Sequence, residues 1–238
     1  MRRSITVLLL LLTSPAAADT VGAGALRAEV TGEPFALAFA QQNGPTLTVR
    51  ELGFDSARAT GGTLRRDGAA LTGELQTDDP LGRTISVRIE PAGPGSIRLT
   101  ATATGASAVR IAFATVGNER FYGFGERSHL VEGSGSEIES YVSDGPYVER
   151  DRPFIKAATP PWAARDRNDS TYYPVPWLLS SRGYGALVEG AATSVFDLAG
   201  SASWSARAEG AQLAVRVFAG PSMAAALRRF TAATGRQP

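Results

Sequence analysis

The chain of 238 residues has no cysteine, a single histidine and a single lysine. Without cysteine, neither a disulfide framework nor a lipid-modified cysteine is possible. One histidine, His129, cannot build a metal site that needs several histidines. We therefore expect a fold held together by its core alone, with no metal and no cofactor.

Charge of one sign, long apolar runs and helical periodicity are also scarce. The formal net charge of +1 gives no overall basic field, which argues against nucleic acid as a partner. The apolar run at residues 5–12 is less than half of the roughly 20 residues that a membrane span needs, and no later segment approaches that length. Before residue 220, no segment has both the length and the 3.6-residue period of a helix, which excludes a doubly wound α/β domain.

The amino terminus has the three parts of a secretory signal peptide. A basic start at residues 1–4 is followed by the apolar run, and then by three alanines, Ala16 to Ala18, before Asp19. The alternative, a buried core helix, does not account for these flanks. We predict a signal peptide over residues 1–18, cleaved after Ala18, and a secreted or periplasmic protein of about 220 residues, enough for one all-β domain.

The pattern from Gly22 to Val116 is typical of antiparallel strands that hide one face. Short segments alternate between apolar and polar residues and are separated by turn residues, as in residues 84–90, 96–101 and 109–113. Because each strand buries one face and exposes the other, two such sheets must meet. The sequence therefore predicts an all-β protein, an antiparallel β-sandwich, over residues 19–219.

The last third of the chain returns to strands and then changes period. Residues 177–180 and 184–188 predict a hairpin, and residues 204–206 are expected to pair with 213–217 across a turn at Gly210. Beyond residue 220, Pro221 suits a first helical turn and Gly235 a stop, so a single C-terminal helix is expected.

The stretch Phe121–Arg127 and the segment after it carry the clearest functional pattern. Two glycines alternate with three aromatic rings, which suits a strand end where the backbone bends or lies close to a neighbour. Carboxylates then outnumber arginines, and they stand at positions 126, 132, 137, 139, 144, 149 and 151. Carboxylates accept hydrogen bonds from hydroxyl groups and aromatic rings cover sugar C–H faces, so this composition indicates a neutral polyol as ligand.

Four blocks of the sequence together resemble the amino-terminal domain of glycoside hydrolase family 31. They are Glu119–Arg127, Thr171–Trp177, Leu179–Gly185 and Phe196–Asp197, in the family's order. The family contains α-glucosidases, α-xylosidases and sulfoquinovosidases, which act in carbohydrate metabolism. The resemblance implies a galactose mutarotase-like supersandwich, followed at residues 220–238 by a connector helix that leads to a catalytic (β/α)8 barrel.

The resemblance also implies where the chemistry lies. Both catalytic aspartates of the family are on the barrel, so we expect no catalytic residue in this chain, a truncation before the barrel, and no hydrolysis of glycosides by the chain alone. The family's loop over the barrel mouth has the pattern Trp-Asn-x-Asp. Residues Tyr141 to Asp144 match its outer positions, with Val142 in place of asparagine, so Asp144 is the best candidate contact.

Four more residues are candidates for substrate binding: Tyr141, Tyr147, Glu126 and Arg127. Three of the five candidates, Asp144, Glu126 and Arg127, also have an alternative interpretation. Asp144 precedes Gly145 and Pro146 and could be a solvated turn acid. Glu126 and Arg127 could instead fix a strand end through hydrogen bonds to the backbone. The group Asp166, Asn168 and Asp169 lacks the ligand spacing of a calcium loop.

Three functions remain open at this point. The first is a non-catalytic module that braces the barrel of an α-glycosidase and supplies one wall of its sugar pocket. The second is a stand-alone secreted carbohydrate-binding protein. The third is a mutarotase, which the single histidine disfavours because those enzymes generally use histidines with a glutamate.

Overall fold

The computed structural model describes residues 18–127, 130–142, 152–158, 160 and 171–235. Within these ranges it has sixteen strands and two helices. The first nine strands are β1 (Asp19–Ala23), β2 (Leu26–Thr31), β3 (Ala36–Gln41), β4 (Thr46–Phe54), β5 (Ala57–Asp67), β6 (Ala70–Thr77), β7 (Ile85–Pro91), β8 (Ser96–Thr102) and β9 (Ala108–Ala114). The remaining elements are β10 (Phe121–Gly125), β11 (Glu137–Ser140), α1 (Arg152–Ala158), β12 (Pro174–Ser180), β13 (Tyr184–Glu189), β14 (Ser194–Asp197), β15 (Ser203–Glu209), β16 (Gln212–Ala219) and α2 (Met223–Thr234).

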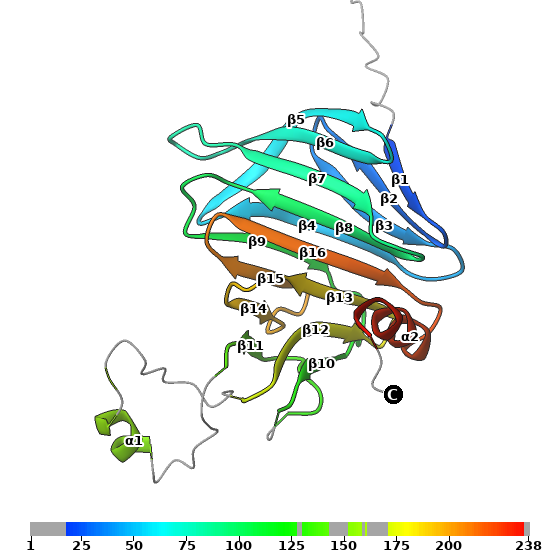
Figure 1. Cartoon of the computed structure of the whole chain (residues 1–238). Helices are drawn as coiled ribbons and strands as arrows, with labels where there is room; N and C mark the ends of the chain where they lie inside the picture. The colour runs from blue at the N-terminus through cyan, green and yellow to red at the C-terminus, as the bar shows by residue number, and fades with distance from the viewer. Residues whose placement is uncertain (1–17, 128–129, 143–151, 159, 161–170, 236–238) are drawn as a thin grey trace, which may run out of the picture.

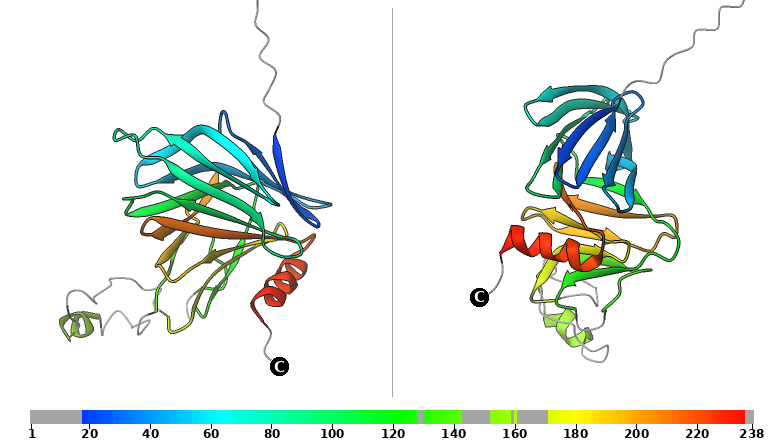
Figure 2. Two further views of the ribbon diagram at one scale, coloured as in Figure 1. Left: turned by 45° about the horizontal axis from the view of Figure 1, so that its top comes forward. Right: turned by 90° about the vertical axis from the view of Figure 1, so that its right-hand side faces the viewer.

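The strands form two layers that are joined along one continuous hydrogen-bonded path. One layer has the order β10-β12-β13-β16-β8-β7-β6-β5, and the other has β4-β9-β15-β14-β11, with β3, β2 and β1 continuing from β4. All the pairs between named strands are antiparallel, and Figures 1 and 2 show the two layers facing each other. The expected all-β sandwich is confirmed.

Apolar residues at alternate positions of the strands form the core between the layers. In β7, Ile85, Val87 and Ile89 are buried, while the residues between them are exposed. The same alternation buries the apolar residues of β8 and β9, as predicted. Side chains from both layers meet in one large apolar cluster, which is the main source of the stability of the fold.

The pairing expected between residues 204–206 and 213–217 is wrong. Trp204 pairs with Phe113 of β9, in one layer, while Val215 pairs with Leu99 of β8, in the other. The turn at Gly210 is therefore an arch from one layer to the other. Both strands still bury their apolar residues in the same core, from opposite sides.

The hairpin and the C-terminal helix appear where they were predicted. β12 pairs with β13 from Trp177 to Ser180. Helix α2 starts after Ser222, whose side chain accepts a hydrogen bond from the Ala225 N–H, and ends before Gly235, which has a φ of 102°.

Helix α2 covers the outer face of the layer that contains β12, β13 and β16 (Figures 1 and 2). Under the helix lies a second apolar cluster, in which the Phe230 ring stacks on Trp177 at 4.1 Å between centroids. In the described part of the chain, neither helix has the length and apolar character that a membrane crossing requires.

Two short elements lie between β10 and β12 in the sequence. Strand β11 pairs with β14, through Ile138 opposite Phe196, and so belongs to the sandwich. The seven-residue helix α1 lies outside both layers (Figure 1).

Candidate functional site

The glycines of β10 have the geometry that the sequence pattern predicted. Gly123 and Gly125 have φ values of 110° and 80°, in the region that favours glycine. A Cβ added to Gly123 would lie 2.5 Å from the carbonyl oxygen of Trp177, and one added to Gly125 would lie 2.2 Å from that of Tyr173. The register between β10 and β12 shifts between these two glycines, so the strand bends there while it stays close to its neighbour.

The rings of β10 are structural. Phe121 and Phe124 are buried in the main core, where Phe121 meets Trp204 edge-on and Phe124 meets Phe196 in the same way. Tyr122 points to the opposite face and packs against the cluster under α2. The motif that identifies this region therefore holds the strand in place, and its rings do not form a ligand platform.

Glu126 and Arg127 have different surroundings. The Arg127 guanidinium donates to the carbonyl oxygens of Phe124 (3.1 Å) and Glu139 (2.8 Å), which ties the end of β10 to β11. These bonds agree with the alternative interpretation of a strand-end residue. Glu126 is exposed, and its backbone N–H donates to the carbonyl oxygen of Tyr173 at 3.0 Å.

The other predicted contacts are described only in part. Tyr141 is half-buried directly after β11, two residues beyond the carbonyl that Arg127 binds. The structure therefore brings Glu126, Arg127 and Tyr141 to the same end of the sandwich. Asp144 and Tyr147 lie outside the described residues, as do His129 and the group at 166–169, so those predictions stay predictions.

Two tyrosines at this end were not among the predicted site residues. Tyr172 and Tyr173 are 62% and 71% exposed, just before β12 begins. The backbone hydrogen bond between Glu126 and Tyr173 joins these two exposed residues, which lie directly after β10 and directly before β12. The signal in the sequence is the pair of consecutive aromatic residues before Pro174, within the block Thr171–Trp177 that resembles the family.

A buried polar network lies just before the start of β10, at the opposite end of that strand from Glu126. The Glu119 carboxylate accepts hydrogen bonds from the hydroxyl groups of Tyr184 (2.5 Å) and Ser180, and the Trp204 indole N–H donates to the Tyr184 oxygen at 2.9 Å. Burial raises the pKa of Tyr184 well above its ordinary value, and the neighbouring Glu119 charge adds to the effect. The network joins the two layers and is closed to a ligand.

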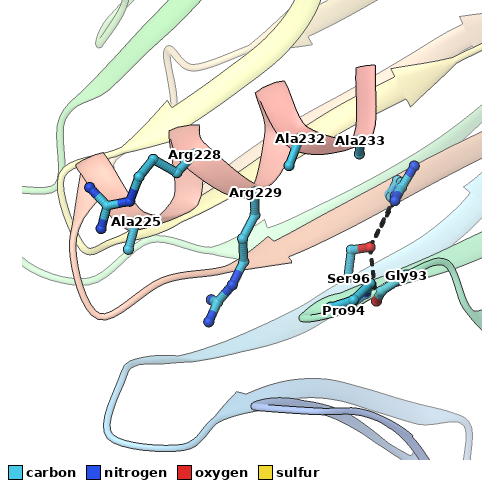
Figure 3. A pocket seen from close by; sticks show the side chains of 9 residues that line it. Gly93, Pro94, Ser96, Ala225, Arg228, Arg229, Ala232 and Ala233 are labelled. Carbon is cyan, nitrogen blue, oxygen red and sulfur yellow. Dashed lines mark hydrogen bonds between the residues drawn. The ribbon is translucent and has the colours of Figure 1, made fainter. Parts of the chain in front are cut away.

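A pocket of about 460 Å³ lies elsewhere, between α2 and the turn from β7 to β8 (Figure 3). Its lining residues are Gly93, Pro94, Ser96, Arg216, Ala225, Arg228, Arg229, Ala232 and Ala233. Three of these are arginines and none is acidic. The pocket therefore has the opposite chemistry to the acidic and aromatic site predicted for a neutral sugar.

Comparison with known proteins agrees with the fold. The chain is 26% identical over 174 residues to an isomaltosyltransferase from Sporosarcina globispora, which covers 73% of this chain and 11% of that protein. A family 31 sulfoquinovosidase from E. rectale, solved with an aza-sugar inhibitor, superposes with a TM-score of 0.59 and 17% identity over all of this chain and 35% of that one. A family 31 dextranase from Flavobacterium johnsoniae has a TM-score of 0.44 and 15% identity, over 92% of this chain and 29% of the dextranase.

The chain thus spans about a tenth of the curated relative and about a third of the sulfoquinovosidase. Residues 12–197, most of the sequence, match the model of the glycosyl hydrolase 31 N-terminal galactose mutarotase-like domain. This match agrees with the blocks quoted from the sequence and with the observed sandwich. The chain therefore belongs to the glycosyl hydrolase 31 family, in which it represents the N-terminal galactose mutarotase-like domain.

Proposed function

We propose that this chain is a non-catalytic, carbohydrate-contacting module of an α-glycosidase, an enzyme that hydrolyses O-glycosyl bonds. The observation that carries the proposal is that Glu126 and Tyr173, both exposed, are joined by a backbone hydrogen bond where β10 ends and β12 begins. Family membership supports the same role.

The chemistry of this end suits binding more than bond cleavage. A carboxylate such as that of Glu126 accepts hydrogen bonds from sugar hydroxyls, and the tyrosine rings offer faces for sugar C–H groups. Retaining hydrolysis needs two carboxyl groups roughly 5 Å apart across the glycosidic bond, which we assign to a catalytic barrel. In this proposal Asp144, Tyr141 and Tyr147 extend the same wall of the sugar pocket.

Helix α2 would connect the sandwich to that barrel. The helix is already docked on the sandwich through Met223, Ala226 and Phe230. Leu227, next to Met223 and Phe230 on the helix surface, remains 42% exposed and offers an apolar contact to a neighbouring domain. Bracing the barrel is thus the second part of the proposed role.

Secretion is also part of the proposal. β1 begins at Asp19, the first residue after the predicted cleavage site, and Arg66 donates to the carbonyl oxygen of Thr20 at 2.8 Å. Cleavage after Ala18 would therefore leave the first strand complete. Mass spectrometry of the exported protein should give a mature chain that starts at Asp19, whereas a retained Met1 would contradict export by this route.

Calorimetric titration separates the module from a stand-alone binding protein. The mature chain is titrated with maltose, isomaltose and an α-xyloside. We expect no saturable heat, because one wall of a pocket buries only part of a sugar. Saturable binding that Tyr173→Ala abolishes would instead favour the stand-alone carbohydrate-binding protein. A reading frame after codon 238 that continues into a barrel with two aspartate motifs would support the module.

A further inference from the structure

The pocket under α2 has an excess of positive charge at its lining. Its three arginines face no lining carboxylate, and Ser96 is the only other lining residue with a polar side chain. A pocket for a neutral sugar would need hydrogen-bond acceptors, which guanidinium groups do not provide. The chemistry of the pocket is therefore unrelated to the sugar wall proposed above.

Arg216 forms one side of the pocket and is held in a fixed position. Its side chain is only 13% exposed, and its Nε and Nη2 atoms donate to the Ser96 hydroxyl at 3.1 and 3.0 Å. Its Nη1 lies 3.7 Å from the carboxylate of Glu189, which also accepts hydrogen bonds from Arg98. Arg98 also pairs with Glu90, so two carboxylates face the two guanidinium groups on this side of the pocket.

Burial lowers the pKa of Arg216, and the nearby Arg98 charge acts in the same direction, against Glu189. An arginine nevertheless keeps its charge at neutral pH. A bound anion would place a further opposite charge beside this partly buried guanidinium and so offset the cost of its desolvation.

The two arginines of α2 add uncompensated charge on the other side. Arg229 donates through Nη1 to the carbonyl oxygen of Ala219, which is a neutral acceptor. Arg228 is exposed, and within the described ranges its side chain has no acidic partner. Figure 3 shows that Arg228 and Arg229 leave the helix in different directions, so they do not converge on one point.

The remaining walls are apolar. Ala232 and Ala233 of α2 lie on the same side of the pocket as each other, opposite the turn that carries Pro94 and Ser96 (Figure 3). A volume of about 460 Å³ is within the usual range for small-molecule pockets, roughly 300 to 1,000 Å³. The space therefore suits a ligand that is larger than a bare ion and has an apolar part.

We propose that this pocket binds a small organic oxyanion, a molecule in which a phosphate, sulfate or carboxylate group is attached to an apolar body. The charges of Arg216, Arg228 and Arg229 together attract the anionic group into the pocket, and charge-assisted hydrogen bonds from the nearest guanidinium hold it there. The apolar body packs against Ala232, Ala233 and Pro94.

The test uses phenyl phosphate, inorganic phosphate and phenol, each titrated into the 238-residue chain at constant ionic strength and followed by NMR. Phenyl phosphate should bind with one saturable site that shifts residues of α2 and of the turn at Gly93 to Ser96. Inorganic phosphate should bind at least about threefold more weakly, because it makes no contact with the apolar walls. Phenol should give no saturable response.

Arg228→Gln is the test variant because Arg228 is exposed and makes no side-chain bond within the described structure. It should weaken the binding of phenyl phosphate by about threefold or more. Arg50→Gln removes an exposed arginine of β4 that does not line the pocket and should leave the affinity unchanged. Equal losses in the two variants, shifts spread over the whole surface, or no saturation would overturn the proposal.

Discussion

At the residue scale, Glu119 and Tyr184 show how one end of the sandwich is fixed. Glu119 precedes β10, Tyr184 is in β13 and Trp204 is in β15, so their hydrogen bonds link the two layers across the core. A buried polar network of this kind is costly to leave incomplete. The network therefore holds the start of β10 close to β13 and β15.

Tyr184→Phe should therefore destabilise the fold by roughly 1–3 kcal/mol, because it leaves the Trp204 N–H without its acceptor and Glu119 without one donor. Urea unfolding at neutral pH measures the change. Tyr122→Phe is the matched control, since Tyr122 is only half-buried and no hydrogen bond of its hydroxyl is found in the described structure. An equal loss of unfolding free energy in both variants would show that the hydrogen bonds of Tyr184 do not stabilise the fold.

Asp55 is a second residue with a measurable role. Its carboxylate accepts hydrogen bonds from the hydroxyl and N–H groups of Ser107 and from the Ala108 N–H, and these bonds tie the turn after β4 to the start of β9. The Ser107 hydroxyl, followed by these backbone bonds and Arg83, lowers the pKa of Asp55, while burial opposes the shift.

A carboxyl group with a lowered folded-state pKa contributes stability above its ordinary pKa, about 3.9, and loses that contribution as the pH falls through the folded value. Asp55→Asn should therefore be less stable than the native chain at pH 7, and the difference should shrink below about pH 4. Urea unfolding from pH 7 to pH 3 tests this. A difference that stays constant over the whole range would contradict the assigned ionisation.

At the element scale, local patterns predicted strands and the last helix but not every partner. The alternation in β7, β8 and β9 and the end signals of α2 depend on neighbouring residues, so the sequence was sufficient for them. Two strands joined by an arch show the same alternation of apolar and polar residues as two strands of a hairpin. For this reason the sequence led us to pair β15 with β16, although each pairs with a different strand. β11 and α1 are too short, at four and seven residues, to give a clear period.

In the variant Phe230→Ala, helix α2 should open more easily while the sandwich stays folded. Phe230→Ala removes the ring that stacks on Trp177 and meets Phe218, so the helix loses its main apolar contact. Hydrogen exchange should become faster in residues 223–234 and stay slow in β7 to β9. Leu227→Ala, at an exposed position of the same helix, serves as the control and should change little. Faster exchange throughout the sandwich in Phe230→Ala would contradict independent docking.

At the scale of the whole molecule, the candidate sites depend on residues far apart in the sequence. Arg216 and Ser96, which meet at the oxyanion pocket, are separated by 120 positions, and no local pattern could join them. The end that carries Glu126 and Arg127 was predictable because the motif there is contiguous. Tyr172 and Tyr173 reach that end only through the pairing of β10 with β12. The proposed function separates sugar contact from bond cleavage and assigns the catalytic carboxylates to another domain.

The most direct test of that separation is the hydrolysis of p-nitrophenyl α-glucoside and α-xyloside by the purified mature chain, shown to be folded by circular dichroism. The account predicts no release of p-nitrophenol above the buffer rate, at any protein concentration. Release that increases in proportion to the protein and stays with it through purification would contradict the central claim that this sandwich contacts sugar without cleaving it.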